Sequence, residues 1–79
     1  MNMSIQVKLL GLLADVVGKS ELQVDKVSDT DALKKQLLSD FPSLANKSFI
    51  VAVKKQIVRN NQKLEAGDEV ALLPPFAGG

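Results

Sequence analysis

The residues with the clearest potential for chemistry are the last six, residues 74–79, which end in Gly78-Gly79. Pro74 and Pro75 stop any preceding strand, because proline has no N–H to donate and a fixed φ. Glycine has no side chain, so a Gly-Gly end can pass a narrow opening and leave its terminal carbonyl open to attack. Six extended residues reach roughly 20 Å, enough to carry a carboxylate into another protein's pocket.

A frayed chain end is the alternative interpretation, since termini are often disordered and rich in glycine. The Pro-Pro block directly after an expected strand favours a functional tail. We therefore expect the carboxylate of Gly79 to be the reactive group. Pro74, Pro75, Phe76 and Ala77 are then the segment that enters a partner.

The composition removes most other reactive groups. The 79 residues include no Cys and no His, which excludes thiolate nucleophiles, Cys/His zinc sites, iron–sulfur clusters and imidazole bases. The nine acidic residues are scattered and show no calcium-loop spacing, so we expect no metal site. Any part in catalysis then falls to the C-terminal carboxylate.

Charge and hydropathy limit the partners. The net charge of +1 gives no strong field toward nucleic acid or membrane. The first four residues lack the basic region of a signal peptide, and no apolar run approaches the roughly 18 residues that span a bilayer. We expect a cytoplasmic protein that binds neither nucleic acid nor membrane.

The first half of the chain predicts a hairpin followed by a helix. Residues 4–10 and 21–25 alternate between apolar and polar, as in half-buried strands. Residues 12–18 between them form either a turn of helix or a compact apolar loop that ends at Gly18. Asp29 is suited to cap a helix that ends before Pro42. The buried stripe of that helix comprises Leu33, Leu37, Leu38 and Phe41.

The second half predicts three more strands. The apolar run 49–53 favours a central strand covered on both faces. Residues 54–59 predict a turn and a short strand, and residues 64–68 a turn with Gly67 at positive φ. Residues 69–73 predict the last strand, with Leu73 facing outward. This order resembles the α+β β-grasp arrangement of ubiquitin: a mixed sheet of about five strands over one main helix. We expect a domain over 1–73 and a flexible tail over 74–79.

Three stretches carry a more specific resemblance. They are Val51-Ala52-Val53, Leu64-x-x-Gly67-Asp68-Glu69-Val70-Ala71 and Pro74-Pro75-x-x-Gly78-Gly79. Together they resemble the MoaD family of sulfur carriers, the small subunit of molybdopterin synthase. The likeness spans nearly the whole chain, and its specificity lies in residues 64–79. The departures from the family pattern are Ala14-Asp15 for Arg-Glu, Lys54 for Asn, Leu72-Leu73 for two aromatics, and Phe76 for Val.

This resemblance implies a mechanism. A ubiquitin-activating-type adenylyltransferase uses ATP to adenylate Gly79, and a sulfur donor protein converts the adenylate to a thiocarboxylate. The large synthase subunit receives the tail, in a heterotetramer of two small and two large subunits. Two sulfurs convert cyclic pyranopterin monophosphate into the dithiolene of molybdopterin. The small subunit binds no cofactor, and we expect no enzymatic activity from it alone.

Docking also needs a surface. Alternation turns Leu10 and Leu73 away from the core, and Ile57 joins them if the sheet order is suitable, which predicts an apolar partner patch. The alternative is that these residues pack under the 11–18 loop or are scattered surface residues. Lys54, Lys55 and Arg59 are either steering charges or a solvated rim. Phe76 either anchors the tail in a partner pocket or folds back on the sheet.

Three other functions remain open on the sequence. The first is a sulfur carrier for the thiazole of thiamine, which has the same fold and a Gly-Gly end. The second is a ubiquitin-like modifier joined to lysines through Gly79. The third is a β-grasp adaptor that uses its sheet face, in which case Gly78-Gly79 would be dispensable.

Overall fold

Five strands form one mixed sheet in the order β2-β1-β5-β3-β4. The computed structural model describes residues 4–25 and 27–75. Its elements are β1 (Ser4–Leu9), α1 (Leu12–Val17), β2 (Glu21–Asp25), α2 (Thr30–Asp40), the 3₁₀ helix η1 (Pro42–Asn46), β3 (Ile50–Val53), β4 (Gln56–Val58) and β5 (Glu69–Leu73). β5 lies in the middle, parallel to β1 and antiparallel to β3. β2 and β4 pair antiparallel with β1 and β3 and form the two edges.

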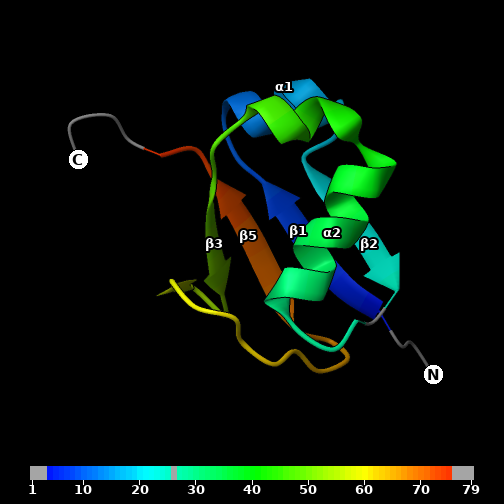
Figure 1. The fold of residues 1–79 in the computed structure, drawn as a ribbon, viewed down its shortest axis with the longest axis vertical. Helices are drawn as coiled ribbons and strands as arrows, with labels where there is room; N and C mark the ends of the chain where they lie inside the picture. Colours follow the sequence, from blue (N-terminus) through cyan, green and yellow to red (C-terminus); the bar gives the residue numbers. More distant parts are fainter. Residues whose placement is uncertain (1–3, 26, 76–79) are drawn as a thin grey trace.

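Figure 1 shows α2 lying across one face of this sheet, with α1 and η1 at the end toward which β1 and β5 point. We call the face toward α2 the inner face and the opposite face the outer face. An opening hairpin, a crossing helix and returning strands make a β-grasp fold. The predicted fold class is therefore confirmed.

The helix forms where the sequence predicts it. The Asp29 side chain accepts a hydrogen bond from the Ala32 amide at 2.9 Å and so satisfies a free N–H of the first turn. This bond favours the carboxylate and holds the pKa of Asp29 below its usual value. The helix ends at Asp40, and Phe41 caps it ahead of Pro42. Leu33 and Leu37 are buried on the sheet side.

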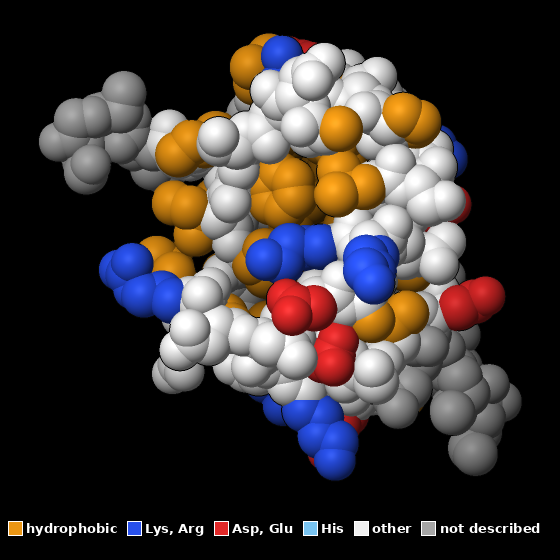
Figure 2. Space-filling model, in the orientation of Figure 1, with side chains coloured by type: hydrophobic (Ala, Val, Ile, Leu, Met, Phe, Trp, Pro, Cys, Tyr) orange, Lys and Arg blue, Asp and Glu red, His pale blue; other side chains and the backbone are white. Residues whose placement is uncertain are grey.

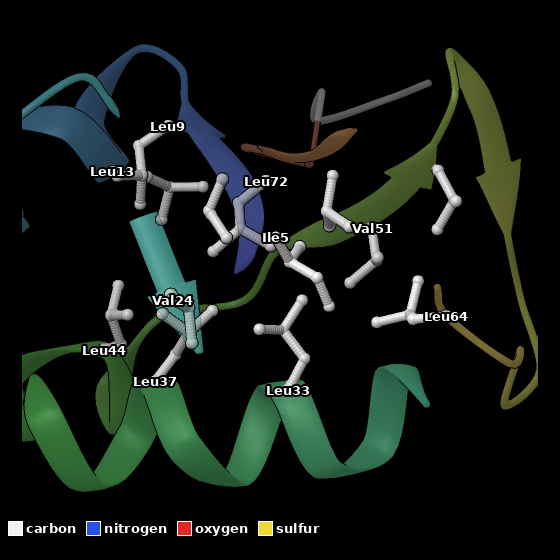
Figure 3. Close-up of a cluster of buried hydrophobic side chains, with 13 residues drawn as sticks. Ile5, Leu9, Leu13, Val24, Leu33, Leu37, Leu44, Val51, Leu64 and Leu72 are labelled. Carbon is white, nitrogen blue, oxygen red and sulfur yellow. The ribbon is translucent and has the colours of Figure 1, made fainter. Parts of the chain in front are cut away.

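The core lies between α2 and the inner face. Figure 3 shows Leu33 and Leu37 pointing from the helix toward the side chains of the strands. Burying these aliphatic side chains supplies the main favourable term for folding. The buried cluster comprises Ile5, Val7, Leu9, Leu13, Val24, Leu33, Leu37, Leu44, Val51, Val53, Leu64, Val70 and Leu72.

Two core residues were not predicted. Leu44 and Leu64 have exposed fractions of 0% and 1%, although the sequence predicts a turn over 64–68 and singles out no core residue between Pro42 and the run 49–53. Leu44 is brought inward by the 3₁₀ helix η1 that follows Pro42. Leu64 is held by a hydrogen bond from its amide to the Ser28 carbonyl at 2.9 Å. Single buried residues in short loops leave no periodic pattern in a sequence.

Smaller differences concern the elements themselves. Residues 12–17 form a helix, and Gly18 caps it at a φ of 88°. The run 49–53 does form a strand with neighbours on both sides, but the strand begins at Ile50, and the middle of the sheet is β5. Gly67 has a φ of 88°, as its turn predicted.

We predict that Leu44→Ala lowers the free energy of unfolding by about 3 kcal/mol, because it leaves a cavity in a close-packed core. The matched control is Leu12→Ala, the same change at a side chain that is 58% exposed, where the effect stays within about 0.5 kcal/mol. Urea unfolding measures both values. Equal effects would show that η1 is not part of the cooperative core.

Candidate functional site

The root of the tail is fixed by the middle strand. β5 runs to Leu73, which pairs with Ile50 of β3, while the preceding Leu72 pairs with Leu9 of β1. The ladder continues one step further, since the Leu10 amide donates to the Leu72 carbonyl at 3.1 Å. Pro74 has no N–H to extend it. The chain therefore leaves the sheet at Pro74 with both neighbouring strands holding its root.

The chemistry predicted for the tail falls beyond this point. Pro74 is half-buried and Pro75 is exposed. Phe76, Ala77, Gly78 and Gly79 lie outside the described residues, so their predicted roles as tail and reactive end stay predictions.

Gly11 is a neighbour of the tail root that the sequence did not single out. It has a φ of 57°, in the left-handed region that favours glycine, and it separates β1 from α1. A Cβ placed on Gly11 would lie 3.1 Å from Cγ of Pro74, which is tighter than an ordinary van der Waals contact. Gly11 thus lets the Pro74 ring approach the end of β1. The only sign of this contact in the sequence is a glycine placed between an expected strand and an expected apolar turn.

The strand register gathers apolar residues beside the tail root on the outer face. Ala71 pairs with Ala52, which pairs with Ile57 across β4, and Leu73 pairs with Ile50. Continuing the alternation of β1 puts Leu10 beside Leu73. We call these residues the outer apolar patch: Leu10, Ile50, Ala52, Ile57, Ala71 and Leu73.

The three residues predicted to form a patch thus share one face. Leu10 and Ile57 are 45% and 56% exposed, and Leu73 is half-buried. Leu10 and Ile57 are therefore not packed under the 11–18 loop. Ile50 joins them through a cross-strand register that a single sequence does not reveal.

The other end of the outer face is polar. Lys8 on β1 forms an ion pair with Glu69 on β5 at 3.0 Å. The hydrogen bond and negative charge of Glu69 raise the pKa of Lys8. Gln6 donates to Glu21 on the neighbouring strand β2. The outer face is therefore divided into a polar half and an apolar half, and the apolar half adjoins the tail root.

The motif residues before β5 hold this strand in place. Asp68 is 7% exposed, accepts a hydrogen bond from the Glu65 amide at 2.8 Å and forms an ion pair with Lys54 at 3.4 Å. The Gly67 amide donates to the Ser4 carbonyl at 2.8 Å, which ties the turn to the start of β1. The Gly-Asp-Glu part of the motif thus sets where the middle strand begins.

The β3–β4 turn carries two of the predicted steering charges. Lys54 and Lys55 have φ values of 51° and 70° and form a two-residue hairpin turn of the kind that needs positive φ twice. Lys54 is engaged with Asp68, so part of its charge serves the fold. Lys55 and Arg59 are exposed at the β4 edge.

Among residues 4–25 and 27–75, no group of three or more His, Cys, Asp or Glu is placed to hold a metal ion. No helix in the same part of the chain is long and apolar enough to cross a bilayer.

The fold and the position of the tail define a ubiquitin-like β-grasp protein whose middle strand leads into its C-terminal segment. The ThiS family model matches residues 7–79, and the chain belongs to this family. Two curated relatives are each called molybdopterin synthase sulfur carrier subunit. The one from Caenorhabditis elegans is 30% identical and covers 96% of this chain and 98% of the relative. The one from Chlamydomonas reinhardtii is 31% identical, and the match covers 98% of this chain and 100% of the relative.

Solved structures agree on the fold. The small archaeal modifier protein 1 of Methanosarcina acetivorans superposes with a TM-score of 0.82 at 21% identity, over 100% of this chain and 99% of the other. A complex of subunits 1 and 2 of the molybdopterin-converting factor from Helicobacter pylori contains a chain with a TM-score of 0.71 at 25% identity. That match covers 98% of this chain and 100% of the other.

We predict that Gly11→Ala disturbs the tail root and that Gly18→Ala does not. Both positions have positive φ, so alanine strains the backbone at each: by about 1–2 kcal/mol at Gly18, which is in the left-handed helical region, and by more at Gly11, whose ψ of −134° lies outside it. Only at Gly11 does the new Cβ meet Pro74, because a Cβ on Gly18 has no heavy atom within 4 Å. Combining each change with Pro74→Ala in a double-mutant cycle should give a coupling of about 0.5 kcal/mol or more for Gly11 and none for Gly18. Equal couplings would contradict the contact.

Proposed function

We propose that this chain is the sulfur-carrier small subunit of molybdopterin synthase, and that its Gly79 carboxylate becomes the sulfur-bearing group. The observation that carries the proposal is the place where the described chain leaves the sheet: Pro74 and Pro75 continue the middle strand of a β-grasp sheet beside the outer apolar patch. The full-length similarity to two proteins named molybdopterin synthase sulfur carrier subunit supports it.

The chemistry follows from the properties of a carboxylate. A free carboxylate is a poor electrophile because it is anionic and stabilised by resonance. An adenylyltransferase of the ubiquitin-activating type transfers AMP from ATP to the Gly79 carboxylate and releases pyrophosphate. A persulfide sulfur on the donor protein attacks the acyl carbon: a C–S bond forms, the C–O bond to AMP breaks, and AMP leaves with that oxygen. A thiol then cleaves the S–S bond of the resulting acyl disulfide and forms a disulfide with the donor sulfur. Gly79 then carries a thiocarboxylate.

A thiocarboxylate is suited to donate sulfur in the synthase reaction. The thiocarboxylate sulfur attacks a side-chain carbon of cyclic pyranopterin monophosphate in the active site of the large subunit, and a C–O bond at that carbon breaks as the C–S bond forms. Water hydrolyses the resulting thioester, which leaves the sulfur on the substrate and returns the Gly79 carboxylate for another round. Two deliveries supply the two sulfurs of the molybdopterin dithiolene, and catalytic side chains come from the large subunit. The small subunit holds no cofactor, and ATP is consumed by the activating enzyme.

The outer apolar patch gives the large subunit a docking surface. An apolar group of this kind beside a functional segment is typical of a partner site. The H. pylori neighbour is a complex of two molybdopterin-converting-factor subunits, which supports a two-subunit assembly here. We extend the proposal to a cytoplasmic heterotetramer of two small and two large subunits.

A protein modifier is the second candidate. The observation that favours it is the likeness to the small archaeal modifier protein 1 of M. acetivorans, at a TM-score of 0.82. In that case the activated Gly79 carbonyl would be attacked by a lysine amine, and an isopeptide bond would form. Both candidate functions need an adenylated Gly79. They differ in what attacks the acyl carbon, which is sulfur for the carrier and a lysine amine for the modifier.

We predict that deleting Gly79 abolishes molybdopterin formation in a reconstituted synthase assay, because the carboxylate that becomes the thiocarboxylate is misplaced by one residue. The free energy of unfolding should stay within about 0.5 kcal/mol, since the deletion lies beyond the sheet. A truncated protein with full activity would sink the mechanism and favour the adaptor.

We predict that Ile57→Glu and Leu73→Glu each weaken binding to the large subunit by about tenfold or more, because a charge is placed in an apolar contact. Leu12→Glu is the matched control for Ile57→Glu, since Leu12 is 58% exposed and Ile57 56%, but Leu12 projects from α1. Calorimetric titration measures binding, and thermal melts check the fold. If Leu73→Glu loses its cooperative melt, Leu73 belongs to the core and the assignment to the outer face is wrong.

A further inference from the structure

The sheet has two grooves on its inner face, one along each edge. The first lies between β2 and α2 and is lined by Leu22, Gln23, Val24, Asp25, Val27, Gln36, Asp40 and Phe41. The second lies between the β3–β4 pair and α2, and its lining residues are Lys34, Phe49, Ile50, Val51, Ile57, Val58 and Arg59. We call the second one the β4 groove. Because β2 and β4 are the two edge strands, the two grooves lie along opposite edges of the sheet.

The β4 groove exists because α2 does not cover the whole inner face. Val51 is buried, but Phe49 and Val58 are only half-buried although both pack against the core. Figure 2 shows hydrophobic side chains gathered in a hollow between α2 and β3, with Lys or Arg side chains at its rim. The hollow has a volume of about 330 Å³, at the small end of the range for binding pockets.

The two grooves differ in charge. Among residues 4–25 and 27–75, the charged residues that line the first groove are Asp25 and Asp40, and those that line the β4 groove are Lys34 and Arg59. Lys34 lies 4.0 Å from Asp31, at the outer limit of an ion pair, and Arg59 takes no part in the ion pairs found between described residues. The described lining of the β4 groove is therefore basic, and it attracts an anionic ligand group.

The basic groove is also the one beside the tail. Ile50 lines it and pairs directly with Leu73, the last residue before Pro74. Ile50 and Ile57 belong at once to the groove and to the outer apolar patch. A protein that binds the tail and the patch therefore reaches the β4 groove without a gap, whereas the first groove lies along β2, on the far side of β1 from β5.

We propose that the β4 groove binds an acidic, apolar segment of the large synthase subunit: an aliphatic or aromatic side chain on its floor, with carboxylates against Lys34 and Arg59. This proposal rests on the proposed function and adds a second contact to it. The partner then grips the β3–β4 corner from both faces of the sheet. Charge in the groove orients the large subunit so that the tail enters its active site.

The test compares charge reversals inside and outside the groove. Arg59→Glu and Lys34→Glu reverse the two groove cations, and Lys35→Glu makes the same change at an exposed position on α2 that does not line it. Titration of each full chain into the large subunit should give a dissociation constant at least about tenfold higher for the groove variants and within about twofold for Lys35→Glu. Melting curves confirm that all three fold.

Two further readouts separate docking from a structural role. For the groove variants, the synthase assay should show a raised KM for the small subunit with kcat unchanged, since the tail chemistry is intact. Their dissociation constant should also depend less on salt than that of the unaltered chain, because an ion pair is lost. Equal binding by all three variants would overturn the proposal.

Other occupants of the β4 groove would give different results, and any of these results would overturn the proposal that a segment of the large subunit binds there. A second copy would appear as a concentration-dependent dimer that Arg59→Glu abolishes. The chain's own tail would appear as shifted NMR signals of Val51 and Val58 when residues 76–79 are removed from the free protein. Failure of the proposed function is distinct: the unaltered chain would then not bind the large subunit, or would bind it and transfer no sulfur.

Discussion

The pairing of β5 on both of its sides is the constraint on which the rest of the molecule depends. Hydrogen bonding to β1 and β3 makes β5 the middle strand of the five, and its Val70 and Leu72 are fully buried. Continuing the chain from this strand puts the start of the tail at a place fixed by hydrogen bonds on both sides. In the proposed function, the tail therefore begins from a fixed point and carries its reactive end into the partner.

The motif that suggested the family has mainly this structural purpose. Asp68 satisfies the Glu65 amide and pairs with Lys54, and Gly67 supplies the positive φ of the turn before β5. Pro74 then ends the strand, and Gly11 makes room for its ring. Much of the resemblance therefore lies in residues that start, hold and stop β5, while the proposed chemistry takes place at the carboxylate of Gly79.

The fold could be predicted because its signals are local. Alternation marks β1, an apolar stripe marks α2, and Asp29 caps the helix as its type suggests. Leu44 and Leu64 could not be predicted as core, because a lone leucine in a short loop has no period. The outer apolar patch was foreseen only in part: alternation identifies Leu10 and Leu73, but the inclusion of Ile50 depends on which strands are neighbours. The β4 groove was out of reach for the same reason, since it joins α2 to β3 and β4.

The central claim is that Gly79 carries sulfur, and intact mass spectrometry of the chain purified from its own cells tests it most directly. The account predicts a gain of about 16 Da on the C-terminal peptide, the replacement of one oxygen by sulfur. Because thiocarboxylates hydrolyse, a sample with an unmodified end is incubated with ATP, the activating enzyme and the sulfur donor and measured again. A terminus that stays unmodified after this treatment, or a Gly79 found joined to a lysine, would contradict the account.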